Sequence, residues 1–174
     1  MKLLIVIDMQ NDFVTGCLGT PEARAIVPKV KKKIEEWDGD LFYTRDTHLE
    51  NYLDTPEGKK LPIPHCIEDT EGWQIVNGVF RDESYTRIID KRTFGYLGWT
   101  MYLTNFSGGC HYDEIQLIGL DSNICVVTNA LIIKTMYPKT EIIVDASCCA
   151  GTTPQAHRAA MEVMKSCQIT VIGE

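Results

Sequence analysis

Short apolar runs alternate with longer segments of helical periodicity along most of the chain. The apolar runs are four to seven residues long, which is typical of buried strands. The helical pattern is clear in residues 21–37, because Ala23, Ile26 and Val30 recur on one face. Strands are predicted at residues 3–7, 41–44, 87–90, 114–120, 141–144 and 168–172. Helices are predicted at residues 21–37, 97–103, 123–134 and 154–166.

This alternation predicts an α/β fold, in which a mostly parallel sheet carries helices on both faces. The length of 174 residues fits one domain spanning residues 1–174. A stretch rich in proline and glycine, residues 46–84, interrupts the pattern and is expected to be irregular.

The charge balance narrows the classes of partner. The formal net charge is −7, so the surface repels nucleic-acid phosphates and anionic lipids, and neither is expected as a partner. No apolar stretch has the length of a membrane span. The apolar run at the N-terminus is short and meets an acid at Asp8, which is typical of a core strand rather than of a signal peptide. We therefore expect a cytoplasmic protein.

The seven cysteines form no Cys-x-x-Cys pair, so neither a zinc ribbon nor a thioredoxin-type site is indicated. Most of them are expected to be buried as small apolar side chains. Cys148, Cys149 and the following Gly151-Thr152-Thr153 lie at the end of a predicted strand, close enough to line a pocket there.

Polar side chains follow four of the predicted strands where each strand ends. Ligands of open parallel sheets bind outside the carboxyl ends of the strands, so these side chains are expected at one edge. They are Asp8, Asp46 with His48, Lys91, and the segment from Asp121 to Cys125.

The thiol of Cys125 is the candidate nucleophile. Asp121, Ser122 and Asn123 are all favourable helix N-caps, which places Cys125 in the first turn of the following helix. The free N–H groups and the dipole of that turn favour an anion, so they would ease loss of the thiol proton and receive an oxyanion. The alternative is that Cys125 is an ordinary core residue.

Two charged side chains accompany this thiol. Asp8 ends the first strand, where a carboxylate serves either as a general base or as a cap for backbone groups. Lys91 ends the third strand, where a lysine is either a partner for these groups or an exposed surface residue.

A second set of residues has the chemistry of metal ligands. Asp46 and His48 alternate along an extended segment, so their side chains point the same way. Glu57 and His65 follow in the irregular stretch. Two imidazoles and two carboxylates suit one divalent ion, chiefly zinc, with iron or manganese as further choices. The alternative is a set of hydrogen bonds within the loop.

Taken together, these motifs resemble the isochorismatase-like cysteine hydrolases. The resemblance rests on Asp8 in an Asp-x-Gln-Asn-Asp-Phe run, on Lys91, and on Gly119 followed six residues later by Cys125. The Asp46-x-His48 pair and the segment Pro64-His65-Cys66 are similar to those of the nicotinamidases within that family. Three departures lie around the expected pocket: Asp121-Ser122-Asn123 where relatives often have Ala-Thr-Asp, Leu61 ahead of the Pro62-Ile63-Pro64 segment, and residues 92–96 after the lysine.

The resemblance implies a six-stranded parallel sheet in a Rossmann-like three-layer fold. It implies Asp8, Lys91 and Cys125 as the catalytic residues. It also implies a cis peptide between Leu120 and Asp121, and an oxyanion hole made by the backbone N–H groups of Asp121 and Cys125. Asp46, His48, Glu57 and His65 would hold the metal ion. Phe13 would stack on the substrate ring, with Leu61 also at the substrate.

The implied reaction is hydrolysis of nicotinamide to nicotinate and ammonia through a thioester on Cys125, in a homo-oligomeric enzyme. An alternative is a sibling cysteine amidase acting on another small amide or ureido compound. A vinyl-ether hydrolase would not need the cysteine. A hydrolase whose metal activates water would stay active without Cys125. A non-catalytic binding domain on the same fold would lack at least one of the three catalytic residues. His157 is expected on a helix surface without a role.

Overall fold

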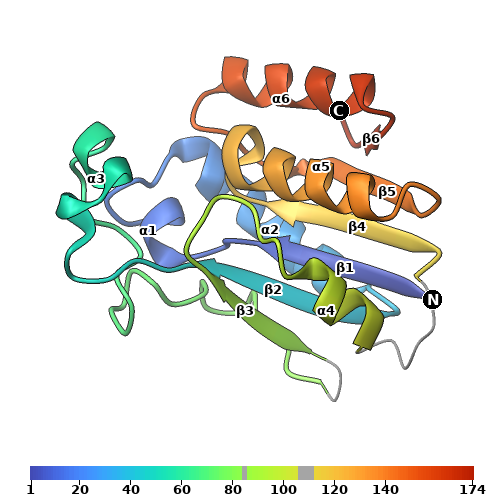
Figure 1. The fold of residues 1–174 in the computed structure, drawn as a ribbon, viewed down its shortest axis with the longest axis horizontal. Coiled ribbons are helices and arrows are strands. Elements are labelled where there is room, and N and C mark those ends of the chain that lie inside the picture. The colour runs from blue at the N-terminus through green and yellow to red at the C-terminus, as the bar shows by residue number, and fades with distance from the viewer. Residues whose placement is uncertain (84–85, 106–111) are drawn as a thin grey trace.

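The computed structural model describes residues 1–83, 86–105 and 112–174. It contains six parallel strands in the order β3-β2-β1-β4-β5-β6, which confirms the predicted sheet (Figure 1). The strands are β1 (Lys2–Ile7), β2 (Asp40–Asp46), β3 (Arg87–Lys91), β4 (Glu114–Gly119), β5 (Glu141–Cys149) and β6 (Thr170–Ile172).

The central strand β1 is buried on both faces. Its residues from Leu3 to Ile7 have no exposed surface, which accounts for a continuous apolar run instead of an alternating one. The strand pairs with β2 on one side, where Leu3 lies opposite Asp40, and with β4 on the other, where Ile7 lies opposite Gly119. The strand order changes direction between β1 and β4, so the crevice at their carboxyl ends is the expected ligand site.

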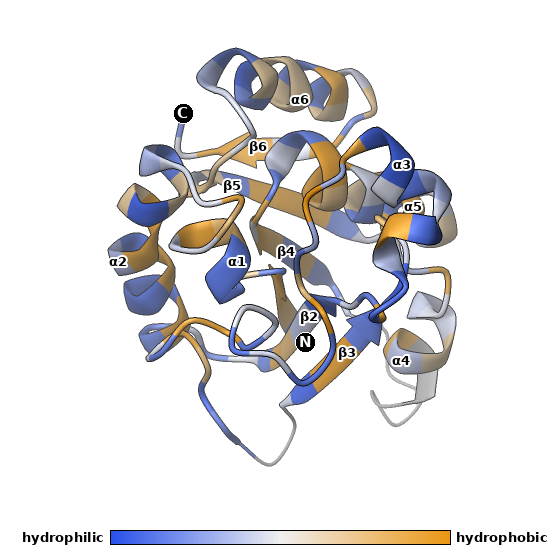
Figure 2. Cartoon of the chain, turned by 90° about the vertical axis from the view of Figure 1, so that its left-hand side faces the viewer, coloured by the Kyte–Doolittle hydropathy of each residue, from blue (hydrophilic) through white to orange (hydrophobic). Residues whose placement is uncertain are grey.

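Helices cover both faces of the sheet. On one face α4 (Trp99–Asn105), α5 (Val127–Met136) and α6 (Pro154–Ser166) pack through residues such as Trp99, Ile133 and Met164. On the other face lie α1 (Asn11–Val14) and α2 (Pro21–Glu35), which pack through Phe13 and Val30. Figure 2 shows mostly hydrophobic strands between helices that carry both hydrophobic and hydrophilic residues.

The two longest helices begin as their sequences indicate. Thr20 precedes α2 and Thr153 precedes α6, and each threonine side chain accepts a hydrogen bond from a backbone N–H of the first turn. Each helix then starts with a proline, whose missing N–H costs nothing at that position. No helix within the described segments combines the length and apolarity that a bilayer span requires.

The stretch predicted as irregular does contain two short helical elements. A 3-10 turn, Tyr52–Asp54, leads into α3 (Pro56–Lys60), whose N-cap is Thr55. In Figure 1 these elements and α1 lie at the left-hand end of the sheet, beyond the carboxyl end of β1. They therefore build one wall above the strand ends.

The segment after β4 has an unusual backbone. Gly119 has a φ of 118°, and a Cβ there would lie 2.0 Å from the carbonyl oxygen of Ile7, so only glycine fits. The peptide bond between Leu120 and Asp121 is cis, as the resemblance implied. Residues Ser122–Val126 form a π-helical turn before α5 begins, where a regular helix was expected from residue 123. This segment carries Cys125 to the edge of the sheet.

Candidate active site

A cavity of about 650 Å³ opens at the carboxyl ends of the central strands. Residues from both expected groups reach it, so the thiol and the metal-type side chains share one pocket. Its walls include Phe13, Leu18, Thr20, Asp46, Pro56, Glu57, Lys60, Leu61, His65, Phe94, Asp121, Ile124, Cys125 and Thr152.

Asp8 is fully buried at the end of β1. Its φ of 46° lies in the left-handed region, which aspartate tolerates better than most residues. Its Oδ1 accepts a hydrogen bond of 2.6 Å from the Thr44 hydroxyl, and its Oδ2 lies 2.6 Å from the Lys91 Nζ. One oxygen is thus held by β2 and the other by β3.

Lys91 was expected either beside these groups or on the surface, and the structure buries it almost completely. Besides Asp8, its ammonium lies 3.5 Å from the Asp46 Oδ1 and donates to the Cys125 Sγ at 3.5 Å. A buried cation requires such partners, because an unpaired charge in the interior is costly. Asp8, Lys91 and Cys125, here called the thiol cluster, therefore form one electrostatic unit.

The acidity of the Cys125 thiol differs from the sequence-based expectation. Burial raises its pKa, and the Asp8 carboxylate raises it further, while Lys91 acts in the opposite direction. The net pKa is well above that of a free thiol, so the prediction of an easily ionised thiol was wrong for the free chain. The helix-end argument considers only local backbone groups and omits the carboxylate that β1 delivers.

The pKa values of Asp8 and Lys91, the other two members of the thiol cluster, are also raised. Burial raises the pKa of Asp8, with Lys91 opposing. Burial lowers the pKa of Lys91, but Asp8, Cys125 and Asp46 more than offset this, and the net pKa lies above its ordinary range. The cluster therefore holds a carboxyl with high proton affinity beside a thiol and a permanent cation, which suits proton transfer between sulfur and carboxylate.

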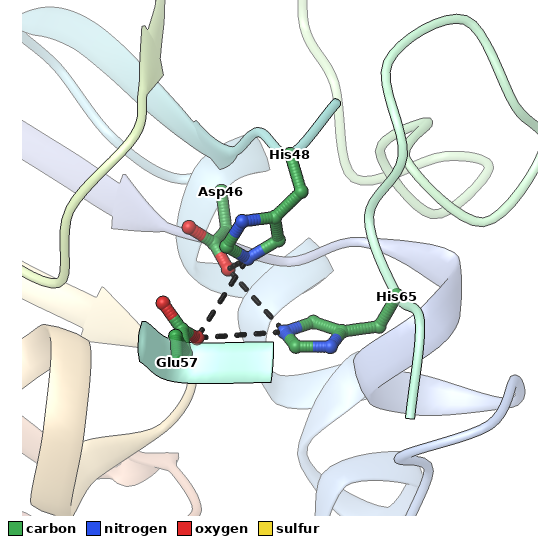
Figure 3. A group of neighbouring side chains, drawn as sticks. All are labelled: Asp46, His48, Glu57 and His65. Atoms are coloured by element: carbon green, nitrogen blue, oxygen red, sulfur yellow. Dashed lines mark hydrogen bonds and ion pairs between the residues drawn. The ribbon is translucent and has the colours of Figure 1, made fainter. Parts of the chain in front are cut away.

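The metal-type residues come together as the second cluster, which we call the histidine cluster (Figure 3). One ligand atom from each of four residues lies within 4.8 Å of all the others. They are Asp46, His48, Glu57 and His65.

Distances within the histidine cluster are those of donors that face a common point. The Asp46 Oδ2 lies 3.1 Å from the His48 Nε2 and 3.7 Å from the His65 Nε2. The Glu57 Oε1 lies 3.7 Å from the His48 Nε2 and 4.0 Å from the His65 Nε2. Two imidazole nitrogens and two carboxylate oxygens make a donor set suited to a first-row divalent ion, so this chain's own residues support a divalent metal here.

The ligand-bearing segments are fixed by side chains outside the cluster. His65 Nδ1 bonds the Ile63 carbonyl at 2.9 Å, which leaves its Nε2 facing the cluster. The Asp12 carboxylate accepts the Cys66 N–H at 2.8 Å and fixes the loop beside His65. Glu57 stands in the first turn of α3 and is the most exposed donor, with 27% of its side chain accessible.

Asp46 belongs to both clusters. Its Oδ2 faces the two histidines and its Oδ1 faces Lys91. Burial acts to raise its pKa, but the histidines and Lys91 lower it well below its usual range. Asp46 therefore stays ionised, as a metal ligand must.

Two residues that sequence reasoning did not single out hold these groups in place. The Gln10 amide accepts the Asp46 N–H at 2.7 Å and donates to the Asp46 carbonyl at 2.9 Å, so it ties the ends of β1 and β2 together. The Asn129 amide donates to the Cys125 carbonyl at 2.8 Å and accepts from the Trp99 indole at 2.9 Å. The sequence offered one signal for Asn129, because it is an amide four residues after Cys125 in a mostly apolar helix.

Phe13 and Leu61, the two residues expected at the substrate, both line the cavity. The rings of Phe13 and His65 are tilted, with centroids 5.6 Å apart, so Phe13 presents an apolar surface next to the histidine cluster. The backbone of Asp121 lies at the cis peptide beside Cys125.

Two expectations around the pocket were wrong. Thr152 lines the cavity, but Cys148 and Cys149 do not, because β5 extends through both residues and they pack in the cores on opposite faces of the sheet. His157 is half-buried rather than a surface residue, and its Nδ1 lies 3.0 Å from the Ser122 hydroxyl. Contacts between α6 and the turn before α5 decide this position, and a helical pattern does not reveal them.

Comparisons with known proteins identify a matching family model and similar folds. The family model for the isochorismatase domain matches residues 2–173. A nicotinamidase of Saccharomyces cerevisiae is 25% identical over 220 residues, which covers 100% of each chain. Among solved structures, a pyrazinamidase of Pyrococcus horikoshii in complex with zinc is 25% identical with a TM-score of 0.78, and 99% of each chain is covered. A nicotinamidase/pyrazinamidase of Bacillus subtilis is 23% identical with a TM-score of 0.81, covering 98% of each chain.

Proposed function

The chain belongs to the isochorismatase family, and on this premise we propose that it is a metal-containing nicotinamidase that hydrolyses nicotinamide to nicotinate and ammonia. The observation that carries the proposal is that one cavity is lined by members of both clusters, Cys125 of the thiol cluster and Asp46, Glu57 and His65 of the histidine cluster. The two clusters are joined through Lys91 and Asp46. A linear carboxamide on a ring has two ends to place, and the cavity offers a nucleophile for one and a metal site for the other. We propose that residues 1–174 act as one domain.

In the first half of the reaction, Asp8 accepts the thiol proton and the sulfur attacks the carboxamide carbon. The high pKa of the buried Asp8 makes it a competent acceptor, and the thiol needs a partner because its own pKa is raised. The Lys91 ammonium stabilises the developing thiolate. The backbone N–H groups of Asp121 and Cys125 are the proposed donors to the oxyanion.

The proton then moves from Asp8 to the amide nitrogen. The carbon–nitrogen bond breaks, ammonia leaves, and the acyl group remains on Cys125 as a thioester. A water molecule gives a proton to Asp8 and attacks the thioester carbon. The carbon–sulfur bond breaks, nicotinate leaves, and Asp8 returns the proton to the sulfur, so one carboxylate serves both halves.

The histidine cluster fits the donor set of zinc, and we propose zinc as its ion, held by Asp46, His48, Glu57 and His65. When bound, the ion supplies a Lewis-acid contact to the ring nitrogen of the substrate. Phe13 and Leu61 then limit where the ring lies, because they form apolar walls of the same cavity. The amide group would point toward Cys125.

The test is ammonia release from nicotinamide by wild type and by Cys125→Ala, with the metal content of each measured first. We expect release by wild type and a loss of at least about a thousandfold in the folded, metal-loaded variant. Cys167→Ala, which removes an exposed thiol, is the matched control and should keep full activity.

Two results would contradict the proposal in different ways. Activity that survives in Cys125→Ala would point to metal-activated water instead of the thiol. A metal-loaded wild type whose thiol reacts with iodoacetamide, but which leaves nicotinamide intact, would point to another small amide or ureido substrate.

A further inference from the structure

The side chain of Asp121 is the one carboxyl of the cavity that neither cluster uses. Asp121 lines the pocket together with Cys125 and Ile124 of the same turn. Its backbone carbonyl accepts the N–H groups of Ile124 and Val126, so the main chain is fixed. Its carboxyl, by contrast, makes no hydrogen bond or ion pair with any side chain in residues 1–83, 86–105 or 112–174.

The surroundings of this carboxyl are predominantly negative. Burial raises its pKa to about 7, the Asp8 and Asp46 carboxylates raise it, and His65 lowers it. Lys60 also lines the cavity, but it is exposed and forms no ion pair within the described part of the chain.

Asp121 is half-buried, and a polar group of this kind that lacks a protein partner is satisfied by whatever enters the pocket. A carboxylate accepts hydrogen bonds and attracts positive charge, and it repels another carboxylate. The substrate of the proposed reaction carries N–H donors at its amide, whereas the product carries an oxyanion at the same position. Asp121 lines the same cavity as Cys125, so its carboxyl shares the pocket with the one group that differs between substrate and product.

We propose that Asp121 is a specificity-determining residue, whose carboxylate favours ligands with an N–H donor or a positive charge at the reacting end and disfavours the carboxylate product. This inference rests on the proposed function for the identity of the ring. It concerns the Asp121 side chain alone, separately from the backbone N–H already assigned to the oxyanion. Its consequence in turnover is weak inhibition by nicotinate.

The experiment measures binding of two ring-matched ligands to the zinc-loaded protein by calorimetry at about pH 8, where a carboxyl with a pKa of about 7 is mostly ionised. One is nicotinate, and the other is the aminomethylpyridine with its arm at the same ring position, which is mostly protonated at that pH. In Asp121→Asn we expect nicotinate to bind about tenfold more tightly and the amine about tenfold more weakly than in wild type, because one unit charge has been removed.

Two variants serve as matched controls. Asp121→Glu keeps the charge, and its ratio of the two affinities should stay within about threefold of wild type. Asp54→Asn removes an exposed carboxylate outside the cavity and should leave both affinities unchanged. Should Asp121→Asn fail to fold or to load zinc, Asp121→Ser provides the same comparison.

An unchanged ratio in a folded, zinc-loaded Asp121→Asn would overturn the proposal, and so would tighter binding of nicotinate than of the amine to wild type. Neither affinity requires turnover. A shifted ratio in a protein that does not hydrolyse nicotinamide would refute the proposed function and keep the role of Asp121. An unchanged ratio in an enzyme that hydrolyses nicotinamide would refute the role of Asp121 and keep the proposed function.

Discussion

The thiol cluster and the histidine cluster share one cavity but are built differently. Asp8 follows β1 and Lys91 ends β3, on either side of β2, and neither has exposed side-chain surface. The histidine cluster takes only Asp46 from a strand, and its other donors come from a loop and from the short helix α3. The comparison indicates that the sheet fixes the thiol cluster, whereas the histidine cluster is positioned mainly by loop contacts such as those of His65 and Cys66.

The largest expected effect comes from Asp8→Asn, which keeps the shape of the thiol cluster and removes its proton acceptor. We expect the rate of ammonia release to fall about a thousandfold or more. The Asp8 charge raises the pKa of Cys125, although burial is the larger cause, so the thiol of the variant should ionise at lower pH. The pH dependence of iodoacetamide alkylation measures that shift.

An Asp8→Asn enzyme that loses activity while its thiol becomes more acidic would separate proton transfer from thiol ionisation. A thiol that becomes less acidic would contradict the arrangement of charges described here. Both conclusions require that the Asp8→Asn variant still holds its metal ion.

The next effect is on stability. In Lys91→Met the Asp8 and Asp46 carboxylates lose their buried cation, and we expect the free energy of unfolding to fall by about 3–5 kcal/mol near neutral pH. The loss should shrink as the pH falls, because Lys91 normally lowers the pKa of Asp8, and without it Asp8 takes up a proton more readily in the folded state. Urea unfolding at two pH values provides the measurement.

Lys32→Met is the control for this variant, because the Lys32 side chain is exposed on α2 and its removal should cost less than about 0.5 kcal/mol. Equal losses in the two variants would show that the thiol cluster does not need its cation.

A smaller effect is expected in the histidine cluster. Glu57→Gln removes the donor that is most exposed and that stands on the short helix α3, so zinc affinity should fall by about 10- to 100-fold while zinc still binds. His65→Ala should lose more, since His65 is buried and held by the Ile63 carbonyl. Competition with a coloured chelator ranks the two variants, with Glu50→Gln as an exposed control.

The smallest effect tests the turn that carries Cys125. His157→Ala removes the partner of the buried Ser122 hydroxyl, and we expect a loss of about 1 kcal/mol in stability. Urea unfolding measures it, and Gln155→Ala on the same helix is the control. A drop in the rate of ammonia release without a drop in stability would assign the contact to positioning of Cys125 instead.

The sheet could be predicted because its central strands are buried on both faces. β1 has a continuous apolar run, and β4 is apolar between Ile115 and Gly119 except for the buried Gln116. Runs of this kind specify a central strand without knowledge of the partners. The shared strand edge followed from parallel topology alone. The short helix α1 was not predicted, because four residues carry too little periodicity to mark a helix.

Properties that depend on contacts across the sheet could not be predicted. The burial of Lys91 depends on Asp8 and Asp46, which reach it from two other strands. The raised pKa of Cys125 depends on the same long-range contacts, and it reversed the conclusion drawn from the helix end. The hydrogen bond between His157 and Ser122 joins residues that are 35 positions apart. Residue types indicated which groups are present, and packing decides their ionisation.

The two oxygens of Asp46 face different clusters, and this has a thermodynamic consequence. One carboxylate cannot respond to an ion on its Oδ2 without changing its interaction with Lys91 on its Oδ1. Ion binding and proton binding in this pocket are therefore linked functions. If the ion changes the proton affinity of Cys125 by some factor, then protonation of Cys125 must change the affinity for the ion by the same factor. In the proposed reaction, a covalent acyl group on the sulfur ends its proton exchange and would therefore change the affinity for the ion once in each cycle.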